Sequence, residues 1–192
     1  AEIVKNLLAF SRQEQQCFAP ADMAKIIEST LILIRTFMKK DQIRLTVEIA
    51  DDLPLIKCRS QQVQQVLMNL LTNARDALNQ RYPDFDENKA ITICAEAFCA
   101  EGQSWVRITV VDRGTGISRD VAARIFDPFF TTKPRDQGTG IGLAVSYGIV
   151  RDHKGRLSVE SEVEEFSRFL LELPADPDAA GGVGYGTRVD RR

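Results

Sequence analysis

Two asparagines four residues apart give the first indication of chemistry in this 192-residue sequence. Asn69 and Asn73 lie in a segment whose apolar periodicity predicts a helix over 61–79, with Ser60 as its cap. Residues four apart share one helix face, so both amides would point the same way. A side-chain oxygen there could coordinate Mg²⁺, which prefers hard oxygen ligands together with substrate phosphates. Taken alone, the pair is explained better by two buried amides with hydrogen-bond partners.

A carboxylate at the end of a predicted strand is the second candidate, in the segment Asp112-Arg-Gly114-Thr-Gly116. Aspartate and glycine are common in turns, so this pattern alone is a weak signal. After a buried strand, however, the Asp112 carboxylate could accept a hydrogen bond from a ligand amine, and the glycines would let the backbone approach a flat ring. Adenine offers such an amine, whereas guanine would place its carbonyl against the carboxylate. The position would therefore select ATP over GTP.

A polar loop with three phenylalanines follows, over residues 126–134. Phe126, Phe129 and Phe130 are too apolar for an ordinary solvated connection, and a surface cluster that pins the loop is one explanation. The other is a mobile lid, which its aromatic groups anchor in alternative positions. In that case Lys133 could carry a positive charge to the terminal phosphate of a nucleotide.

The loop ends at residues 138–143, with the sequence GTGIGL, where a helix is predicted to begin. Backbone N–H groups that glycine leaves uncovered at a helix start form an anion site suited to a di- or triphosphate. The segment is not a Walker loop, because it lacks GK[ST] and does not follow a strand. If it is taken alone, a simple joint between loop and helix explains the glycines equally well.

Periodicity and turn residues elsewhere predict the elements that must position these four segments. Helices are expected from a cap at Asp22 to about Lys40 and over about 140–152, with a short helical stretch at 119–126. Strands are expected at 43–49, 54–58, 90–98, 105–111, 157–160 and 168–173. This order predicts an α/β two-layer sandwich, in which helices cover one face of a mixed sheet.

The chain is predicted to divide into a folded domain at residues 17–174 and two terminal attachments. Residues 175–192 include a small, glycine-rich stretch at 179–186, which is typical of a flexible tail or linker. Residues 1–16 carry an apolar stripe at helical spacing, formed by Ile3, Val4, Leu7, Leu8 and Phe10. Either this is the end of a longer helix that packs on another helix, or it is an ordinary first helix on the domain core.

Composition is typical of a soluble globular protein, with 44% hydrophobic and 27% charged residues. A formal net charge of −2 offers no basic field for phosphates, so no nucleic-acid partner is expected. No apolar run approaches the roughly 20 residues that span a bilayer, so no direct membrane contact is expected of this segment. The four cysteines form no CxxC pair and fit free thiols in a reducing cytosol, which predicts a cytoplasmic location even if a longer parent protein is membrane-anchored.

In this order, the four segments resemble the asparagine box, first glycine box, phenylalanine box and second glycine box of sensor histidine kinases. The resemblance covers roughly residues 22 to 174 and implies the Bergerat ATP-binding fold with a mobile lid. It implies ATP and Mg²⁺ as ligands, with Asn73 and Asn69 on the metal, and with Asn69 and Lys133 as catalytic residues. The nucleotide-binding residues that it implies are Asn69, Asn73, Asp76, Asp112, Gly114, Gly116, Ile117, Phe130, Thr132, Lys133, Gly138, Thr139, Gly140, Ile141, Gly142 and Leu143.

Further stretches extend the resemblance. Residues 3–13, LLAFSRQ included, resemble the end of the second helix in the kinases' dimerisation hairpin. This implies a homodimeric full-length protein, whose own dimerisation and histidine phosphotransfer domain carries the accepting histidine, and a response regulator receiver domain as a further partner. The only histidine here, His153, is expected to be structural. The PFFTTK wording resembles the nitrogen-regulation branch, while Arg113 replaces a frequent asparagine and residues 162–167 replace a glycine-rich turn with an acidic one.

The activity that the resemblance implies is transfer of the terminal phosphoryl group of ATP to a histidine nitrogen. An ATP hydrolase of the same fold is the main alternative. Such enzymes place a glutamate base at the position of Asn69, and an amide cannot accept that proton at neutral pH. A non-catalytic ATP-sensing module and an anti-sigma serine kinase are further alternatives. The four intact segments argue against the first, and the LLAFSRQ helix argues against the second.

Overall fold

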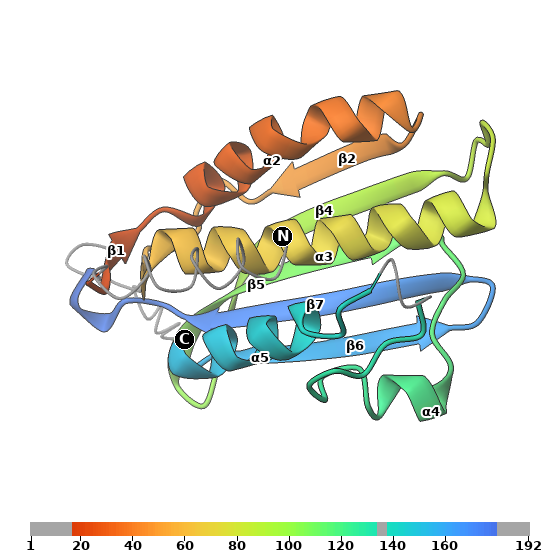
Figure 1. The fold of residues 1–192 in the computed structure, drawn as a ribbon. Helices are drawn as coiled ribbons and strands as arrows, with labels where there is room; N and C mark the ends of the chain where they lie inside the picture. The colour runs from red at the N-terminus through yellow and green to blue at the C-terminus, as the bar shows by residue number, and fades with distance from the viewer. Residues whose placement is uncertain (1–16, 134–137, 180–192) are drawn as a thin grey trace, which may run out of the picture.

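The computed structural model describes residues 17–133 and 138–179 of the chain. Helices pack on one face of a five-stranded sheet (Figure 1), which confirms the predicted two-layer α/β sandwich. The helix end predicted within residues 1–16 lies outside the described residues. The elements are β1 (Ala19–Ala21), α2 (Met23–Lys40), β2 (Arg44–Ile49), β3 (Ile56–Cys58), α3 (Ser60–Arg81), β4 (Ala90–Ala100), β5 (Gln103–Asp112), α4 (Arg119–Ala122), α5 (Gly142–Asp152), β6 (Arg156–Glu162), β7 (Phe166–Pro174) and η2 (Pro177–Ala179).

The sheet has the strand order β2-β4-β5-β7-β6, which makes β5 its central strand. Strand β2 runs parallel to β4, and the three other pairs of this sheet are antiparallel. A parallel pair needs a crossover connection, which β3 and α3 provide here. Because α3 belongs to this crossover, it packs on one face of the sheet. There it lies next to β5, the strand that ends at Asp112 (Figure 1).

Side-chain alternation along β5 determines where the Asp112 carboxylate points. Val106, Ile108 and Val110 are 0%, 0% and 1% exposed and belong to the core between sheet and helices. Asp112 continues the same period of two, so its side chain faces the helix layer rather than the open face of the sheet. A carboxylate therefore ends an otherwise apolar row.

Helices α2, α3 and α5 are held because each places an apolar row against the sheet. The Asp22 side chain caps α2, as predicted, by accepting a hydrogen bond of 2.9 Å from the N–H of Ala24. The prediction that Ser60 caps α3 is wrong. Ser60 is the first helical residue, and Arg59 at the cap position makes no capping bond with its side chain. The fully buried residues of this core include Met23, Ile27, Leu70, Leu71, Ile91, Ile108 and Leu171.

Three short segments differ from the sequence-based expectation. Strand β1 was not predicted, because three residues with a central proline, Pro20, show no alternating pattern. Helix α4 ends at Ala122 rather than near 126. Helix α5 begins at Gly142 rather than Gly140, because Gly140 has a φ of +65° that a right-handed helix cannot contain.

The chain beyond β7 remains attached to the domain as far as the structure describes it. The N–H of Ala175 donates to the Ser104 carbonyl at 2.9 Å, and the N–H of Asp176 donates to the Leu55 carbonyl at 2.7 Å. These contacts hold residues that were predicted to belong to the flexible tail. The predicted tail from residue 180 onward lies outside the described residues.

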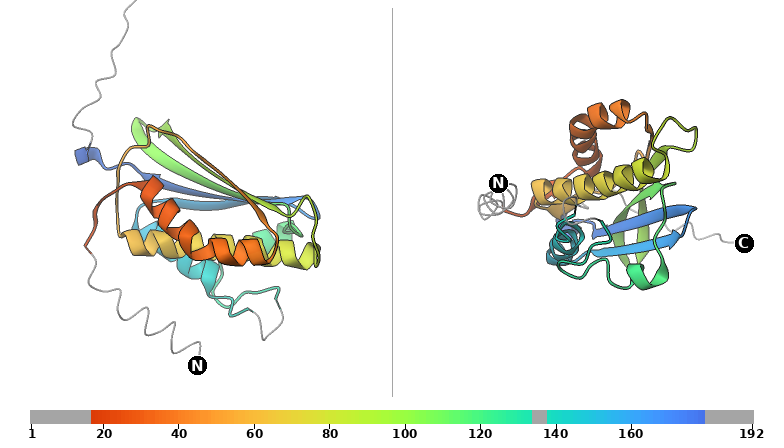
Figure 2. Two further views of the ribbon diagram at one scale, coloured as in Figure 1. Left: turned by 90° about the horizontal axis from the view of Figure 1, so that it is seen from above. Right: turned by 45° about the vertical axis from the view of Figure 1, so that its right-hand side comes forward.

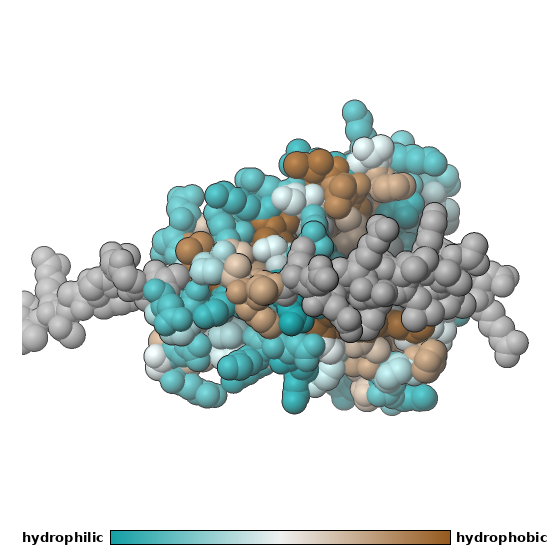
Figure 3. All heavy atoms as spheres, turned by 60° about the vertical axis from the view of Figure 1, so that its left-hand side comes forward, coloured by the Kyte–Doolittle hydropathy of each residue, from teal (hydrophilic) through white to brown (hydrophobic). Residues whose placement is uncertain are grey.

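Helices α2, α3 and α5 lie on the same side of the sheet in both views of Figure 2. The face of the molecule in Figure 3 is mostly hydrophilic, with hydrophobic groups gathered near its top, the side on which α2 lies in Figure 1. On α2, Ile32, Leu33 and Phe37 are exposed. None of the helices in the described residues is both long enough and apolar enough to span a membrane.

Candidate functional site

Two adjoining cavities lie beside α3 and the segment that connects β5 to α5. The first, of about 920 Å³, contains Asp112 and is called the Asp112 cavity. The second, of about 270 Å³, contains Gly140 and is called the Gly140 cavity. Because they share lining residues, the two cavities form one cleft that a single ligand could span. The shared residues are Asn73, Asp76, Val121, Ile125, Thr132, Lys133 and Leu143.

The cleft collects nearly all of the residues predicted to bind a nucleotide. Besides the shared residues, the Asp112 cavity contains Gly116 and Ile117. The Gly140 cavity contains Asn69, Phe130, Gly138, Thr139 and Gly142. Of the predicted residues, Gly114 and Ile141 line neither described cavity. Gly114 acts on the Asp112 side chain instead, and the Ile141 side chain is 39% exposed.

The Asp112 carboxylate is buried, with 2% of the residue exposed, and burial raises its pKa to about 6. A hydrogen bond of 2.8 Å from the N–H of Gly114 to Asp112 Oδ1 acts in the opposite direction. This bond also fixes the orientation of the carboxylate. Among the described residues no group donates to Oδ2, so this oxygen can accept a hydrogen bond from a ligand in the cavity.

The turn after Asp112 is fixed by contacts on both sides. A Cβ atom on Gly114 would lie 2.6 Å from the Ala77 Cβ, so the turn rests directly on α3. Gly116 has a φ of +67°, and a Cβ atom there would lie 2.1 Å from a backbone oxygen at the end of β6. Only glycine lacks the Cβ atom that would clash at each of these two positions, and only glycine adopts the positive φ of Gly116 without strain. The N–H of Ile117 donates to Ser161 Oγ at 2.8 Å, a contact that no sequence pattern had indicated.

The Asn69 amide contacts the start of α5. Its Nδ2 donates to Ser146 Oγ at 3.0 Å, and Ser146 is 1% exposed. Sequence reasoning missed Ser146, although a polar residue on the apolar face of a predicted helix was a usable signal. A Cβ atom on Gly142 would lie 2.6 Å from Asn69 Oδ1, so glycine lets the first turn of α5 lie directly on the amide.

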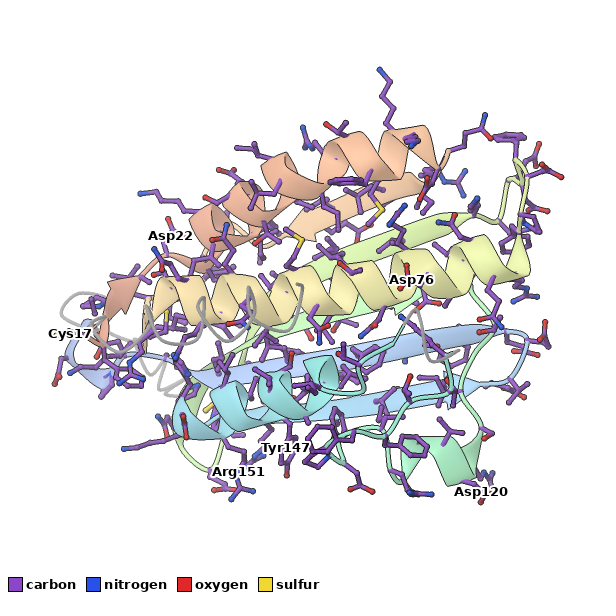
Figure 4. All side chains as sticks on the ribbon, in the orientation of Figure 1. Cys17, Asp22, Asp76, Asp120, Tyr147 and Arg151 are labelled. Carbon is purple, nitrogen blue, oxygen red and sulfur yellow. The ribbon has the colours of Figure 1, made fainter. Side chains whose placement is uncertain are left out.

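The Lys133 ammonium lies beside two oxygen atoms of α3. Its Nζ is 2.6 Å from Asp76 Oδ2 and 3.3 Å from Asn73 Oδ1. The Lys133 and Asp76 side chains are 33% and 36% exposed, and a partly solvated pair of this kind stabilises the fold by only about 0–1 kcal/mol. Figure 4 labels Asp76 on α3, and its contact with Lys133 places its carboxylate beside the connection between β5 and α5.

The oxygens of Asp76 and Asn73 also suit a metal cation. Carboxylate and amide oxygens are hard ligands of the kind that Mg²⁺ prefers. In this structure the positively charged Lys133 ammonium contacts the two oxygens that could bind the metal. The described residues contain no group of three or more His, Cys, Asp or Glu side chains that could hold a metal ion. A metal at this point would therefore need further oxygen ligands from a bound molecule.

Gly140 and the start of α5 form the far wall of the cleft. A Cβ atom on Gly140 would lie 2.5 Å from the carbonyl carbon of Phe129, so this residue must be glycine as well. Helix α5 begins at Gly142, and its cap residue, Ile141, makes no capping bond with its side chain. The first N–H groups of α5 have no intrahelical partner and can bind an anionic ligand.

Two of the three phenylalanines in this connection make ring contacts, and the third is exposed. Phe126 stacks on Tyr147 of α5, with 5.2 Å between ring centroids, and the Arg124 guanidinium lies 4.5 Å from the Phe130 ring. Phe129 is 76% exposed and has a φ of +66°, which is unusual for a large side chain. These contacts agree with a cluster that pins the loop. A mobile lid remains a prediction.

His153 has a structural role, as predicted. Its Nε2 accepts a hydrogen bond of 3.0 Å from the N–H of Arg59, and its Nδ1 lies 2.7 Å from the Ile149 carbonyl, to which it donates in the neutral tautomer. The residue is 4% exposed, and burial lowers its pKa. Both ring nitrogens are engaged, so neither can attack a phosphate without breaking the end of α5.

Comparison with known proteins covers most of the chain. Residues 58–177 match the family of histidine kinase-, DNA gyrase B-, and HSP90-like ATPases. Sporulation kinase E of Bacillus subtilis is 32% identical over 177 residues, which are 92% of this chain and 22% of that protein. The chain thus spans about a fifth of the length of this relative.

Solved structures are similar over the same region. The catalytic domain of histidine kinase ThkA has a TM-score of 0.71 and 28% sequence identity, and the match covers 85% of this chain and 99% of that domain. A structure of ThkA in complex with the response regulator protein TrrA has a TM-score of 0.70 and 28% identity, and covers 92% of this chain and 47% of the matched chain.

Proposed function

This chain belongs to the family of histidine kinase-, DNA gyrase B-, and HSP90-like ATPases, and from that premise we propose that it is the catalytic domain of a sensor histidine kinase. It binds ATP in the cleft between Asp112 and Gly140. It transfers the terminal phosphoryl group to a histidine of the longer protein to which the domain belongs.

One observation carries this proposal. Asp112, Asn73 and Gly140, which are up to 67 residues apart in the chain, line one continuous cleft. A nucleotide triphosphate needs a hydrogen-bond acceptor for its base, a cation site for its phosphates and a row of backbone donors. The cleft offers these three features in that order along its length.

At the base end, Asp112 Oδ2 accepts a hydrogen bond from the exocyclic amine of adenine. The Gly114 N–H holds the other oxygen at 2.8 Å, so the carboxylate is oriented before the ligand arrives. Guanine would oppose its carbonyl to the same buried carboxylate and leave both acceptors unpaired. This asymmetry supports ATP rather than GTP as the substrate.

At the phosphate end, the chain supplies charge and position rather than a covalent group. The sequence predicted Asn73 and Asn69 as the ligands of Mg²⁺. The contacts of the Lys133 ammonium favour Asn73 and Asp76 as the residues that would hold the metal, with Asn69 nearby on the same helix face. When bound, the metal would offset negative charge on the phosphates. Lys133 releases its contact with Asp76 and pairs with the terminal phosphate, while the first N–H groups of α5 donate to the phosphate oxygens.

Asn69 distinguishes this proposal from a hydrolase of the same fold. Its amide is already held by Ser146 and has no basic lone pair that could accept a proton from water. The cleft therefore lacks a base at the position where hydrolysis needs one. Slow hydrolysis together with efficient transfer is the expected behaviour.

The accepting histidine must come from another part of the longer protein, since both ring nitrogens of His153 are engaged. A dimerisation and histidine phosphotransfer domain in a homodimer supplies it, and a response regulator receiver domain receives the phosphate next. The complex of ThkA with TrrA supports this second step by analogy. Assignment to the nitrogen-regulation branch stays a prediction from PFFTTK alone.

Mixing this chain with a separately produced histidine-bearing hairpin and γ-labelled ATP tests the proposal. The expected product is a hairpin that carries acid-labile, base-stable phosphate, and its yield should depend on Mg²⁺. A hairpin in which glutamine replaces the accepting histidine serves as the control. Tight ATP binding without any such phosphate, or rapid ATP hydrolysis by this chain alone, would contradict the proposal.

A further inference from the structure

Three segments that are far apart in the sequence meet beside Asp112, and one arginine connects them. Arg81, the last residue of α3, donates through Nη1 to the carbonyl oxygens of Arg113 and Gly114, at 3.2 and 2.9 Å. The same nitrogen lies 3.3 Å from the carbonyl oxygen of Glu165, in the turn between β6 and β7. One guanidinium therefore ties the end of α3 to two separate turns.

The Arg81 side chain is itself held in place. It is 24% exposed, and its guanidinium carbon lies 5.2 Å from the centroid of the Tyr82 ring. Its Nε is 3.9 Å from Glu164 Oε2. All three carbonyl contacts are made by Nη1, whose two N–H groups lie in the fixed plane of the guanidinium, a geometry that the freely rotating ammonium of lysine does not keep.

The two turns that Arg81 connects also contact each other. The N–H of Glu164 donates to the Thr115 carbonyl at 2.8 Å, and Glu164 has a φ of +61°. Residues 162–167 form the acidic turn that stands in place of the glycine-rich turn expected from the resemblance. This turn thus contacts the turn after Asp112. The Glu164 carboxylate of this acidic turn lies beside the Arg81 guanidinium, which also binds the turn after Asp112.

We propose that Arg81 is a positioning residue for base recognition, which holds the turn after Asp112 so that the Gly114 N–H keeps the carboxylate directed at the adenine amine. The inference rests on the proposed function, because it takes Asp112 as the residue that binds the base. Arg81 lines neither the Asp112 cavity nor the Gly140 cavity. It acts through the backbone of Gly114, whose carbonyl it binds and whose N–H binds Asp112.

The test compares two ligands that differ in a single group. ATP carries the exocyclic amine, whereas purine riboside triphosphate lacks it and cannot gain from a well-oriented Asp112. In Arg81→Met, the affinity for ATP should fall about tenfold, as expected for one or two lost hydrogen bonds, while the affinity for the purine analogue should change by less than about twofold. Both affinities are measured by calorimetry with Mg²⁺ present.

Two further variants make the result interpretable. Arg168→Met is the matched control, since Arg168 lies close by on β7 but pairs with the exposed Glu160 at 3.0 Å. It should leave both affinities unchanged. Arg81→Lys keeps the charge near Glu164 but loses the fixed direction of the Nη1 N–H groups, so it should show a smaller selective loss for ATP. This variant also provides the test if Arg81→Met does not fold.

The outcomes separate the inference from the function on which it rests. A selective loss for ATP supports a positioning role. An equal loss for both ligands would mean that Arg81 only stabilises the cleft, and an unchanged preference for ATP would mean that Asp112 does not depend on Arg81; either result overturns the inference alone. If the native chain bound both ligands equally, the assignment of Asp112 and the inference would both be overturned.

Discussion

The Asp112 carboxylate and the Lys133 ammonium lie in the same cleft, but their surroundings differ. Asp112 is 2% exposed, ends the central strand of the sheet, and is held by a backbone N–H. The Lys133 side chain is 33% exposed and lies in the connection that leads to α5, and among the described residues its ammonium contacts only the Asp76 and Asn73 side chains. One end of the cleft is part of the core, and the other is part of the surface.

This difference fits the chemistry proposed for each end. A base is recognised by hydrogen bonds whose geometry must exist before binding, and groups fixed on a strand provide it. Phosphates and a metal bring their own charges. The contacts of Lys133 with Asp76 and Asn73 must therefore be replaced by contacts with the ligand when it binds. An ion pair worth about 0–1 kcal/mol can be replaced by ligand contacts at little cost. The predictions below test whether the two ends are independent in this way.

The largest effect is expected at the buried end. In Asp112→Asn, the affinity for ATP should fall about 100-fold, because a charged acceptor of the adenine amine is lost from a buried site. Calorimetric titration of ATP into native and variant chains measures this change. Asp120→Asn, which removes an exposed carboxylate from α4, is the control and should bind ATP like the native chain. Equal affinity in Asp112→Asn would remove the base assignment.

A smaller effect is expected at the exposed end. In Lys133→Met, the rate of phosphoryl transfer should fall about tenfold, as expected for one partly solvated contact to a charged group. The affinity for adenosine should stay the same, since adenosine has no phosphate for Lys133 to bind. Transfer is followed with the separate histidine-bearing hairpin, and adenosine binding by calorimetry.

Lys57→Met is the matched control for Lys133→Met. Lys57 forms an exposed pair with Asp178 at 3.4 Å, and neither residue lines the cleft, so its loss should affect neither measurement. If Lys133→Met weakened adenosine binding as strongly as it slowed transfer, the two ends of the cleft would not be independent.

The smallest effect comes from the pKa of Asp112, which burial raises to about 6. The ionised carboxylate is the acceptor, so adenosine affinity should fall about fourfold between about pH 7.5 and about pH 5.5. Folding responds in the opposite direction. Because the folded-state pKa is raised, the folded domain binds this proton more tightly than the unfolded chain, and the resulting stability is lost as the pH rises through about 6.

Adenosine is the right probe for this pH dependence, because it has no phosphate that titrates in the same range. The affinity is measured by calorimetry at each pH. Asp112→Asn should show a flat profile between the two pH values. A native profile as flat as that of the variant would mean that ionisation of Asp112 does not control binding of the base.

Much of the fold follows from local patterns in the sequence. The long apolar periodicities predicted α2, α3 and α5 to within a few residues, and alternation predicted the hairpin of β4 and β5. The same patterns placed Asp112 at the end of a buried strand, with Asn69 and Asn73 on one helix face. These predictions hold because side-chain period and turn chemistry are properties of neighbouring residues.

The sequence by itself thus determined the long helices, the central strands and the types of residue that the cleft would contain. Only the tertiary structure decided which partners hold them. Arg81 reaches Glu165, which is 84 positions away, and Asn69 reaches Ser146, which is 77 positions away. No local period encodes such contacts, because they depend on how α3, α5 and the turn between β6 and β7 pack together.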